Sequence, residues 1–184
     1  MRSIPDPGFA GDHGGADPVV VAALAAYDRA GEAEEVSEHS AVLAALQDAR
    51  VLVPVVAVLG EVEYDVPPGG RAQSPGGRAQ SRLAHDKTSD MAAVLMTGRD
   101  GRTALLAFTG TASLTSWNPE ARPVPVTVRQ AAQAALQDDA SALLVDVAGP
   151  VLFVVEGDDL RALAGGDRLV RLEDGRWGWL SPSG

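Results

Sequence analysis

The stretch Ala104-Leu-Leu-Ala-Phe-Thr-Gly-Thr-Ala-Ser-Leu-Thr-Ser-Trp-Asn-Pro119 begins as an apolar run and changes character at Thr109. The apolar run predicts a buried strand, and the hydroxyl-rich residues after it predict a short helix that Asn118-Pro119 ends. We expect a hydroxyl of Thr109 or Thr111 to cap this helix. An amphipathic helix from Thr127 to about Asp138 follows, with Leu136 expected on its apolar face. Ser141-Ala-Leu-Leu-Val-Asp-Val-Ala-Gly-Pro150 then supplies a second apolar strand. Strands and helices therefore alternate through this part of the chain.

Further strands and helices flank this stretch. The Asp100-Gly101 pair between apolar runs is a strong hairpin signal. Pro54 lies inside a long apolar run and indicates an edge strand or a bulge, because proline cannot donate to a ladder. The strand of the opening stretch should cover residues 103–109, and the other expected strands cover residues 50–59, 91–97, 151–156, 168–172 and 176–180. The other helices cover residues 18–30, 40–49 and 157–164, and we expect Asp17 to be the N-cap of the first.

These elements predict an α+β class: a single domain with a mainly antiparallel or mixed sheet of five to seven strands, covered by helices. We place this domain at residues 40–180 and an acidic, partly disordered N-terminal extension with one short helix at residues 1–39. Residues 1–17 should be disordered, since they are rich in Gly, Pro and Asp. A second disordered segment is expected at residues 67–88, where the unit Pro-Gly-Gly-Arg-Ala-Gln-Ser occurs twice in succession, at 68–74 and 75–81.

Composition excludes several classes of function. The chain of 184 residues has a formal net charge of −10 and no cysteine. A polyanion gains little from binding nucleic acid and is repelled by anionic lipid, so we expect neither nucleic acid nor membrane as a partner. The lack of cysteine removes disulfides and thiolate chemistry. With no secretory signal pattern and no apolar run long enough to cross a bilayer, we expect a cytoplasmic protein.

Few residues suggest catalysis. The three histidines, His13, His39 and His85, form no metal-binding spacing, and we expect them to be exposed and without function. No nucleophile elbow and no phosphate-binding glycine loop is present, so we assign no catalytic residue and no cofactor. Carboxylates at the ends of two expected strands are weak candidates for a divalent cation: Asp146, Glu156, Asp158 and Asp159. The last three are explained equally by a helix beginning at Gly157, whose dipole favours acids in its first turn.

Two tryptophans suggest a binding surface. Trp177 and Trp179 share one face of an expected terminal strand, and tryptophan is enriched where protein partners bind. The alternative is that both cover one side of the core. Trp117 is expected to fasten the short helix to the sheet.

The strand, hydroxyl-rich turn and Trp at residues 108–117, with the helix and strand at 128–149, resemble the N-terminal domain of the SseB family, in its high-GC bacterial form. The likeness covers roughly residues 40–155 and implies an α+β fold. It implies no catalytic residues, because none are established for the family. We therefore expect a non-enzymatic protein-interaction or regulatory domain with a protein partner. The alternatives are a small-ligand or divalent-cation binding protein or enzyme, and a translation-associated accessory protein.

Overall fold

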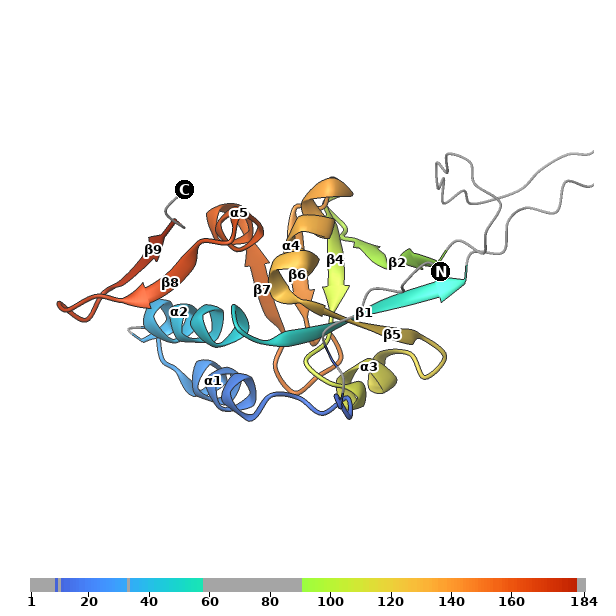
Figure 1. The fold of residues 1–184 in the computed structure, drawn as a ribbon, viewed down its shortest axis with the longest axis horizontal. Coiled ribbons are helices and arrows are strands. Elements are labelled where there is room, and N and C mark those ends of the chain that lie inside the picture. Colours follow the sequence, from blue (N-terminus) through green and yellow to red (C-terminus); the bar gives the residue numbers. More distant parts are fainter. Residues whose placement is uncertain (1–8, 10, 33, 58–90, 182–184) are drawn as a thin grey trace, which may run out of the picture. The chain divides into compact units, whose positions relative to one another are not determined.

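The computed structural model describes residue 9 and residues 11–32, 34–57 and 91–181. By compactness the chain divides into two units, residues 57–92 and the rest. The duplicated segment 68–81, the expected loop 67–88 and His85 lie outside the described residues. Strand β2 (Met91–Ala93) spans the boundary, with Ala93 in the larger unit. All that follows concerns the larger unit (Figure 1).

A four-stranded mixed sheet forms the centre of this unit, in the order β3-β4-β6-β7. Strands β3 (Leu95–Thr97) and β4 (Thr103–Ala107) form the hairpin predicted around Asp100-Gly101. Strand β4 runs parallel to β6 (Ala142–Val145), with Leu105 opposite Leu143, and β6 is antiparallel to β7 (Phe153–Glu156). Because β4 and β6 are parallel neighbours, their carboxyl ends meet at one edge of the sheet.

Side chains alternate between two hydrophobic clusters on the faces of this sheet. Leu105, Leu143 and Phe153 are fully buried in the larger cluster. Leu106 and Phe108 point into the smaller one, where Trp117 packs with its ring centroid 5.6 Å from that of Phe108. The prediction that Trp117 fastens the short helix α3 (Thr111–Trp117) to the sheet is confirmed.

Two of the helices that contribute to the larger cluster come from the second half of the chain. Helix α4 (Val128–Gln137) begins with a capping box between Thr127 and Gln130, and packs against α5 (Gly157–Gly165) and β4. Its buried side chains are Val128 and three alanines, and the small alanines let the helix lie close to its neighbours. Leu136, expected on this face, is instead 39% exposed.

Strand β1 (Arg50–Ala57) pairs antiparallel with β5 (Arg122–Thr127). The expectation that Pro54 marks an edge strand or a bulge is wrong, because β1 has neighbours on both sides and its register with β5 is unbroken from Arg50 to Val55. The Pro54 carbonyl accepts the Val94 N–H at 3.2 Å, and Leu52 exchanges two backbone hydrogen bonds with Phe108. Pro54 is tolerated since it contributes a carbonyl where no N–H is needed.

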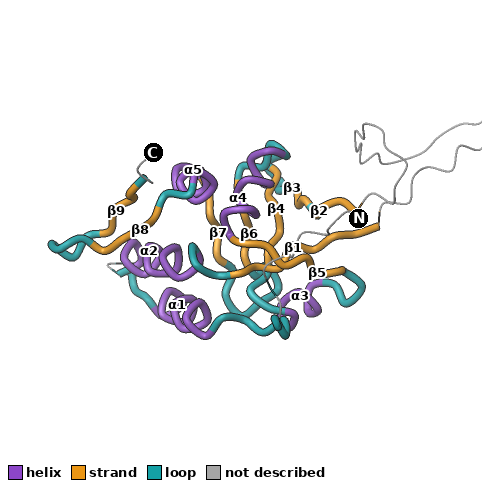
Figure 2. The backbone as a smooth tube through the Cα atoms, viewed as in Figure 1, coloured by secondary structure: helices purple, strands orange, loops and turns teal. Residues whose placement is uncertain are grey.

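Helices α1 (Pro18–Arg29) and α2 (Glu35–Leu46) lie side by side (Figures 1 and 2). Asp17 caps α1 as predicted, accepting the Val19 N–H at 2.7 Å. Val20 and Leu24 of α1 are buried in the same larger cluster as the sheet. The helix that we assigned to an N-terminal extension therefore contributes to the core of the domain.

The segment before α1 is also ordered, which corrects our expectation of disorder for residues 11–17. Arg50 holds the segment: its guanidinium bonds both carboxylate oxygens of Asp12, at 2.6 and 2.7 Å, and the Gly15 carbonyl at 2.8 Å. The Gly14 carbonyl accepts the Thr111 N–H at 2.8 Å. The composition of the segment did not predict its order, because the four polar contacts named above take the place of the apolar contacts that it lacks.

Acid should release this segment. The hydrogen bonds from Arg50 hold the pKa of Asp12 below its ordinary value. A carboxyl whose pKa is lowered by folding stabilises the folded form above its ordinary pKa, and that stabilisation is lost as pH falls through the lowered value. We expect hydrogen-exchange protection of the Thr111 N–H to fall in this acid range. In Asp12→Asn it should be weak already at pH 7 and change little on acidification. Equal protection in the two proteins at pH 7 would contradict the assignment.

The last element is the hairpin of β8 (Arg168–Arg171) and β9 (Trp177–Leu180). The α+β class is confirmed, although the strands form separate sheets and not one of five to seven. Within the described ranges, no helix combines the length and apolar character that a membrane span needs.

Candidate functional site

Asp146 follows β6 directly and lies at the edge where β4 and β6 end. Its backbone is left-handed, with φ of 57°, a conformation that Asp adopts more readily than most residues. Its N–H donates to the Ala107 carbonyl at 2.9 Å, and its carbonyl accepts the Gly149 N–H at 2.8 Å. The side chain is only 3% exposed. The turn after β6 therefore fixes a carboxylate at the end of the neighbouring strand.

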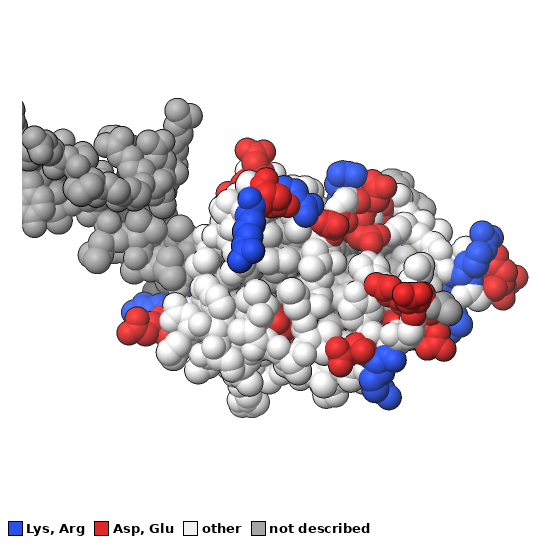
Figure 3. All heavy atoms as spheres, turned by 180° about the vertical axis from the view of Figure 1, so that it is seen from behind, with Lys and Arg blue, Asp and Glu red and all other residues white. Residues whose placement is uncertain are grey.

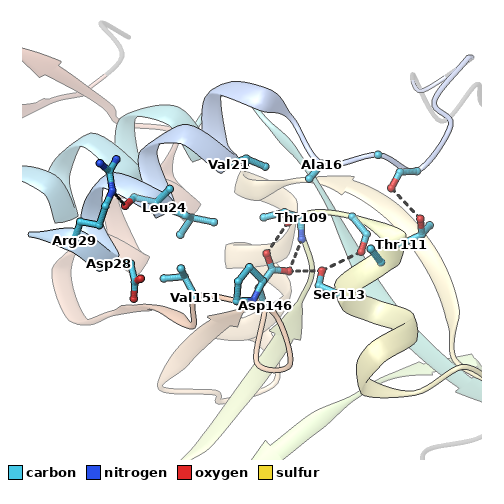
Figure 4. Close-up of a pocket in the computed structure, with 16 residues that line it drawn as sticks. Ala16, Val21, Leu24, Asp28, Arg29, Thr109, Thr111, Ser113, Asp146 and Val151 are labelled. Carbon is cyan, nitrogen blue, oxygen red and sulfur yellow. Dashed lines mark hydrogen bonds between the residues drawn. The ribbon is translucent and has the colours of Figure 1, made fainter.

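This carboxylate gathers three donors from the residues after β4. Thr109 donates its N–H to one oxygen at 2.9 Å and its hydroxyl to the other at 2.5 Å, and the Ser113 hydroxyl donates at 2.6 Å (Figure 4). The predicted hydroxyl cap on α3 is wrong: the N-cap is Gly110, with no side-chain bond. Of the two predicted caps, Thr109 directs its hydroxyl to Asp146, where the carboxylate forms a charge-assisted bond, and Thr111 donates its hydroxyl to the Gly14 carbonyl at 3.2 Å.

A pocket of about 440 Å³ opens beside this cluster. It lies between the N-terminal segment, α1, the start of α3 and the loop between β6 and β7, as Figure 4 shows. One end is polar, with Thr109, Ser113 and Asp146. The rest is mostly aliphatic, including Val21, Leu24 and Val151.

The N-terminal segment forms one wall of the pocket. Gly110 is buried beneath it, so closely that a Cβ at this position would lie 2.8 Å from the Ala16 nitrogen. Gly110 thus allows the segment to lie across the start of α3. The wall depends on the Arg50 contacts described above, because they hold Asp12 and Gly15 at its base.

Charge is sparse around the polar end. Asp28 and Arg29 lie at the far end of the pocket, and the Arg29 Nε donates to the Ala25 carbonyl at 2.8 Å (Figure 4). Figure 3 shows charged side chains gathered toward the top and right of one face, with a broad lower-left area, on the α3 side, nearly free of charge. Asp146 makes no ion pair with any described residue.

The four candidate metal ligands are not brought together. Glu156 pairs with Arg102 at 3.2 Å, and Asp158 pairs with Arg161 at 2.6 Å. Asp158 and Asp159 stand in the first turn of α5, as the helix interpretation predicts. Among the described residues, no three His, Asp or Glu side chains are grouped so that they could hold a metal ion. Glu156 instead borders a second hollow, of about 490 Å³, on the opposite side of the sheet from α4.

His39 is not the exposed residue that we expected, whereas His13 is exposed. The His39 ring lies 4.8 Å from that of Phe153 and 6.1 Å from that of Tyr27, centroid to centroid. Its Nε2 lies 3.2 Å from Asp159, whose other oxygen accepts the Trp179 Nε1–H at 3.1 Å. No local sequence pattern predicts these contacts, because their members come from five separate elements: α1, α2, β7, α5 and β9.

The two terminal tryptophans lie against the larger cluster. Trp177 and Trp179 are both half-buried, and the Trp177 Nε1 is buried without a partner among the described residues. Their role as an interaction surface stays a prediction.

Removing both tryptophans tests the two interpretations. We expect Trp177→Ala with Trp179→Ala to lower the free energy of unfolding by about 2–4 kcal/mol, since each ring covers the core only in part. Urea denaturation followed by circular dichroism measures the loss, with Leu180→Ala, 54% exposed on the same strand, as the control. A double variant as stable as the control would show that the two rings contribute little to the core and are available to bind a partner.

Comparison of the sequence with models of protein families identifies the family. The family model described as the SseB protein N-terminal domain matches residues 20–162. The chain belongs to the SseB family. The match begins within α1 and ends within α5, so it includes Thr109, Ser113 and Asp146. Searches of curated proteins and of solved structures found no match.

Sequence reasoning identified some residues of the polar end of the pocket, but not that they lie together. From the sequence, Asp146 is a weak candidate for a metal ligand and Thr109 is one of two candidates for the helix cap, whereas Ser113 has no individual role. The sequence signal that could have located the polar end is a pair of parallel apolar strands, each followed at once by polar residues. Had β4 and β6 been recognised as parallel neighbours, their polar ends would have been expected to meet.

Proposed function

We propose that this SseB-type domain is a non-enzymatic regulatory domain that binds a small ligand in the pocket at the carboxyl ends of β4 and β6. One observation carries the proposal: the buried Asp146 carboxylate and the hydroxyls bonded to it form the polar end of a largely aliphatic pocket of about 440 Å³. Small-molecule sites combine an apolar lining with a few fixed polar groups, within a volume of roughly 300–1,000 Å³.

The position in the fold supports the same proposal. In sheets with parallel strands, ligands bind outside the carboxyl ends of those strands, because the loops there are free to vary while the strands hold them in place. Here β4 leads into the Thr109–Gly110 turn and β6 leads into the Asp146–Gly149 turn. Hydrogen bonds join the two turns, so the polar end is held rigid before any ligand arrives.

A blocking variant tests this proposal. Ala112 lines the pocket and is exposed on α3, whereas Thr115 is exposed on the same helix and does not line it. Ala112→Trp should fill the opening without disturbing the core, and Thr115→Trp is the matched control. Small-molecule fragments of mixed charge would be screened against the ¹⁵N-labelled full chain by NMR.

We expect fragments that shift the amide signals of Thr109, Ser113 and Val151 in the wild type. These shifts should persist in Thr115→Trp and vanish in Ala112→Trp. The proposal fails if no fragment affects these signals, or if the same fragments affect them equally in Ala112→Trp.

A protein partner at the β8–β9 hairpin is the second candidate. It is favoured by Leu172 and Leu180, which are 38% and 54% exposed beside the two tryptophans. Affinity purification of the tagged protein from its host, at low and moderate salt, would test it. A stoichiometric partner that is lost in Leu172→Ser with Leu180→Ser supports this candidate, and recovery of the protein alone removes it.

A further inference from the structure

We infer that the pocket selects ligands that carry an ammonium group joined to an apolar body, with the ammonium at Asp146. This inference rests on the proposed function and names the ligand class of the same site. It begins from the bonding capacity of one buried side chain. A carboxylate has about four acceptor positions, and the described residues fill three at Asp146.

The three donors are all neutral. A backbone N–H and two hydroxyls stabilise the carboxylate but do not cancel its charge. Arg50 also contacts Thr109, but it donates to the Thr109 carbonyl, at 2.9 Å. Its ion pair is with Asp12. No described residue therefore balances the negative charge at Asp146, and a ligand that carries an ammonium group would do so.

The net charge of the residues that line the pocket is also negative. Its charged lining residues are Asp146, Asp28 and Arg29, which sum to one negative charge. An anionic ligand would be held in a partly desolvated space beside a carboxylate, and like charges in contact oppose binding strongly. An ammonium there gains attraction in a setting where water screens little.

The remaining lining defines the other half of the ligand. Leu24 is buried and Val21 and Val151 line the walls, with several alanines and a proline between them. These side chains offer no charge and no donor, so they fit a hydrocarbon chain or ring. The acceptor position of Asp146 at one end and the aliphatic walls beyond it match a small primary amine with one apolar substituent.

Three probes with the same phenyl ring and similar size separate charge from shape: 2-phenylethylamine, 2-phenylethanol and 3-phenylpropanoate. At pH 7 the first is a cation, the second neutral and the third an anion. Calorimetric titration of the full chain should show the amine binding at least about tenfold more tightly than the other two, equivalent to roughly 1.4 kcal/mol. Asp146→Asn should reduce the preference over the alcohol to about threefold or less, since the amide keeps the shape and removes the charge.

Asp28→Asn is the matched control, because Asp28 is an exposed carboxylate at the far end of the pocket. It should keep the preference for the amine. If Asp146→Asn does not fold, the comparison of the three probes in the wild type still decides. Equal binding of amine and alcohol, or tighter binding of the acid, overturns the inference.

The failures of the two proposals are distinguishable. If amine and alcohol bind equally and Ala112→Trp abolishes both, the ammonium selection is wrong and the pocket remains a ligand site. If none of the three probes binds, the ammonium selection is again wrong, and the screen with fragments of mixed charge decides whether the pocket binds ligands.

Discussion

Phe153→Ala should lower the free energy of unfolding by about 3–5 kcal/mol, since it opens a cavity in the larger cluster. Phe153 has no exposed surface, and its ring lies 5.3 Å from Tyr27 of α1 and 4.8 Å from His39 of α2, centroid to centroid. One side chain of β7 therefore holds both N-terminal helices to the sheet. Equilibrium urea denaturation of the full chain measures the loss.

Leu152→Ala is the control for this variant. Leu152 is the preceding residue and is 47% exposed, so its loss should change the free energy of unfolding by less than about 0.5 kcal/mol. If Phe153→Ala costs no more than Leu152→Ala, then α1 and α2 do not depend on the sheet in the way the structure indicates.

Asp146→Ala should cost about 3–5 kcal/mol, although it removes few apolar contacts. It leaves the buried Thr109 N–H and hydroxyl without their acceptor, whereas the Ser113 hydroxyl can turn to the Gly110 carbonyl, 3.1 Å away. It also forces alanine into a left-handed backbone, at about 1–2 kcal/mol.

Asp146→Asn should cost clearly less, about 1–2 kcal/mol, because asparagine tolerates the backbone and keeps an acceptor for Thr109. Thermal and urea denaturation of both variants would check the order. Equal losses for the two would mean that the backbone and the hydrogen bonds matter less here than the charge itself.

Local patterns in the sequence predicted most elements of the fold. The Asp100-Gly101 hairpin, the Asp17 cap and the apolar strands around Leu105 and Leu143 depend on neighbours close in sequence. The predicted start of helix α2 was the least accurate boundary: we expected Ser40, and the helix begins at Glu35. Its first turn is polar and shows no apolar periodicity.

Relations between distant elements could not be predicted in the same way. Strand β1 pairs with β5 on one side and contacts Phe108, just after β4, on the other, and this places Pro54 inside the sheet. No local sequence pattern predicts these pairings. The order of residues 11–17 depends on Arg50, nearly forty positions away, through charge and carbonyl contacts. The pocket has the same origin, since its polar end comes from two turns that meet only because β4 and β6 are parallel.

The alanine face of α4 limits how the sequence of this family can drift. Ala131, Ala132 and Ala135 are at most 1% exposed, so each methyl group is enclosed by neighbouring side chains. Any larger side chain must move the whole helix, whereas Leu105 and Leu143 can exchange with other aliphatic residues of similar volume. Across natural relatives, these three positions should therefore admit only alanine, glycine or serine, while the strand interior varies among leucine, isoleucine and valine.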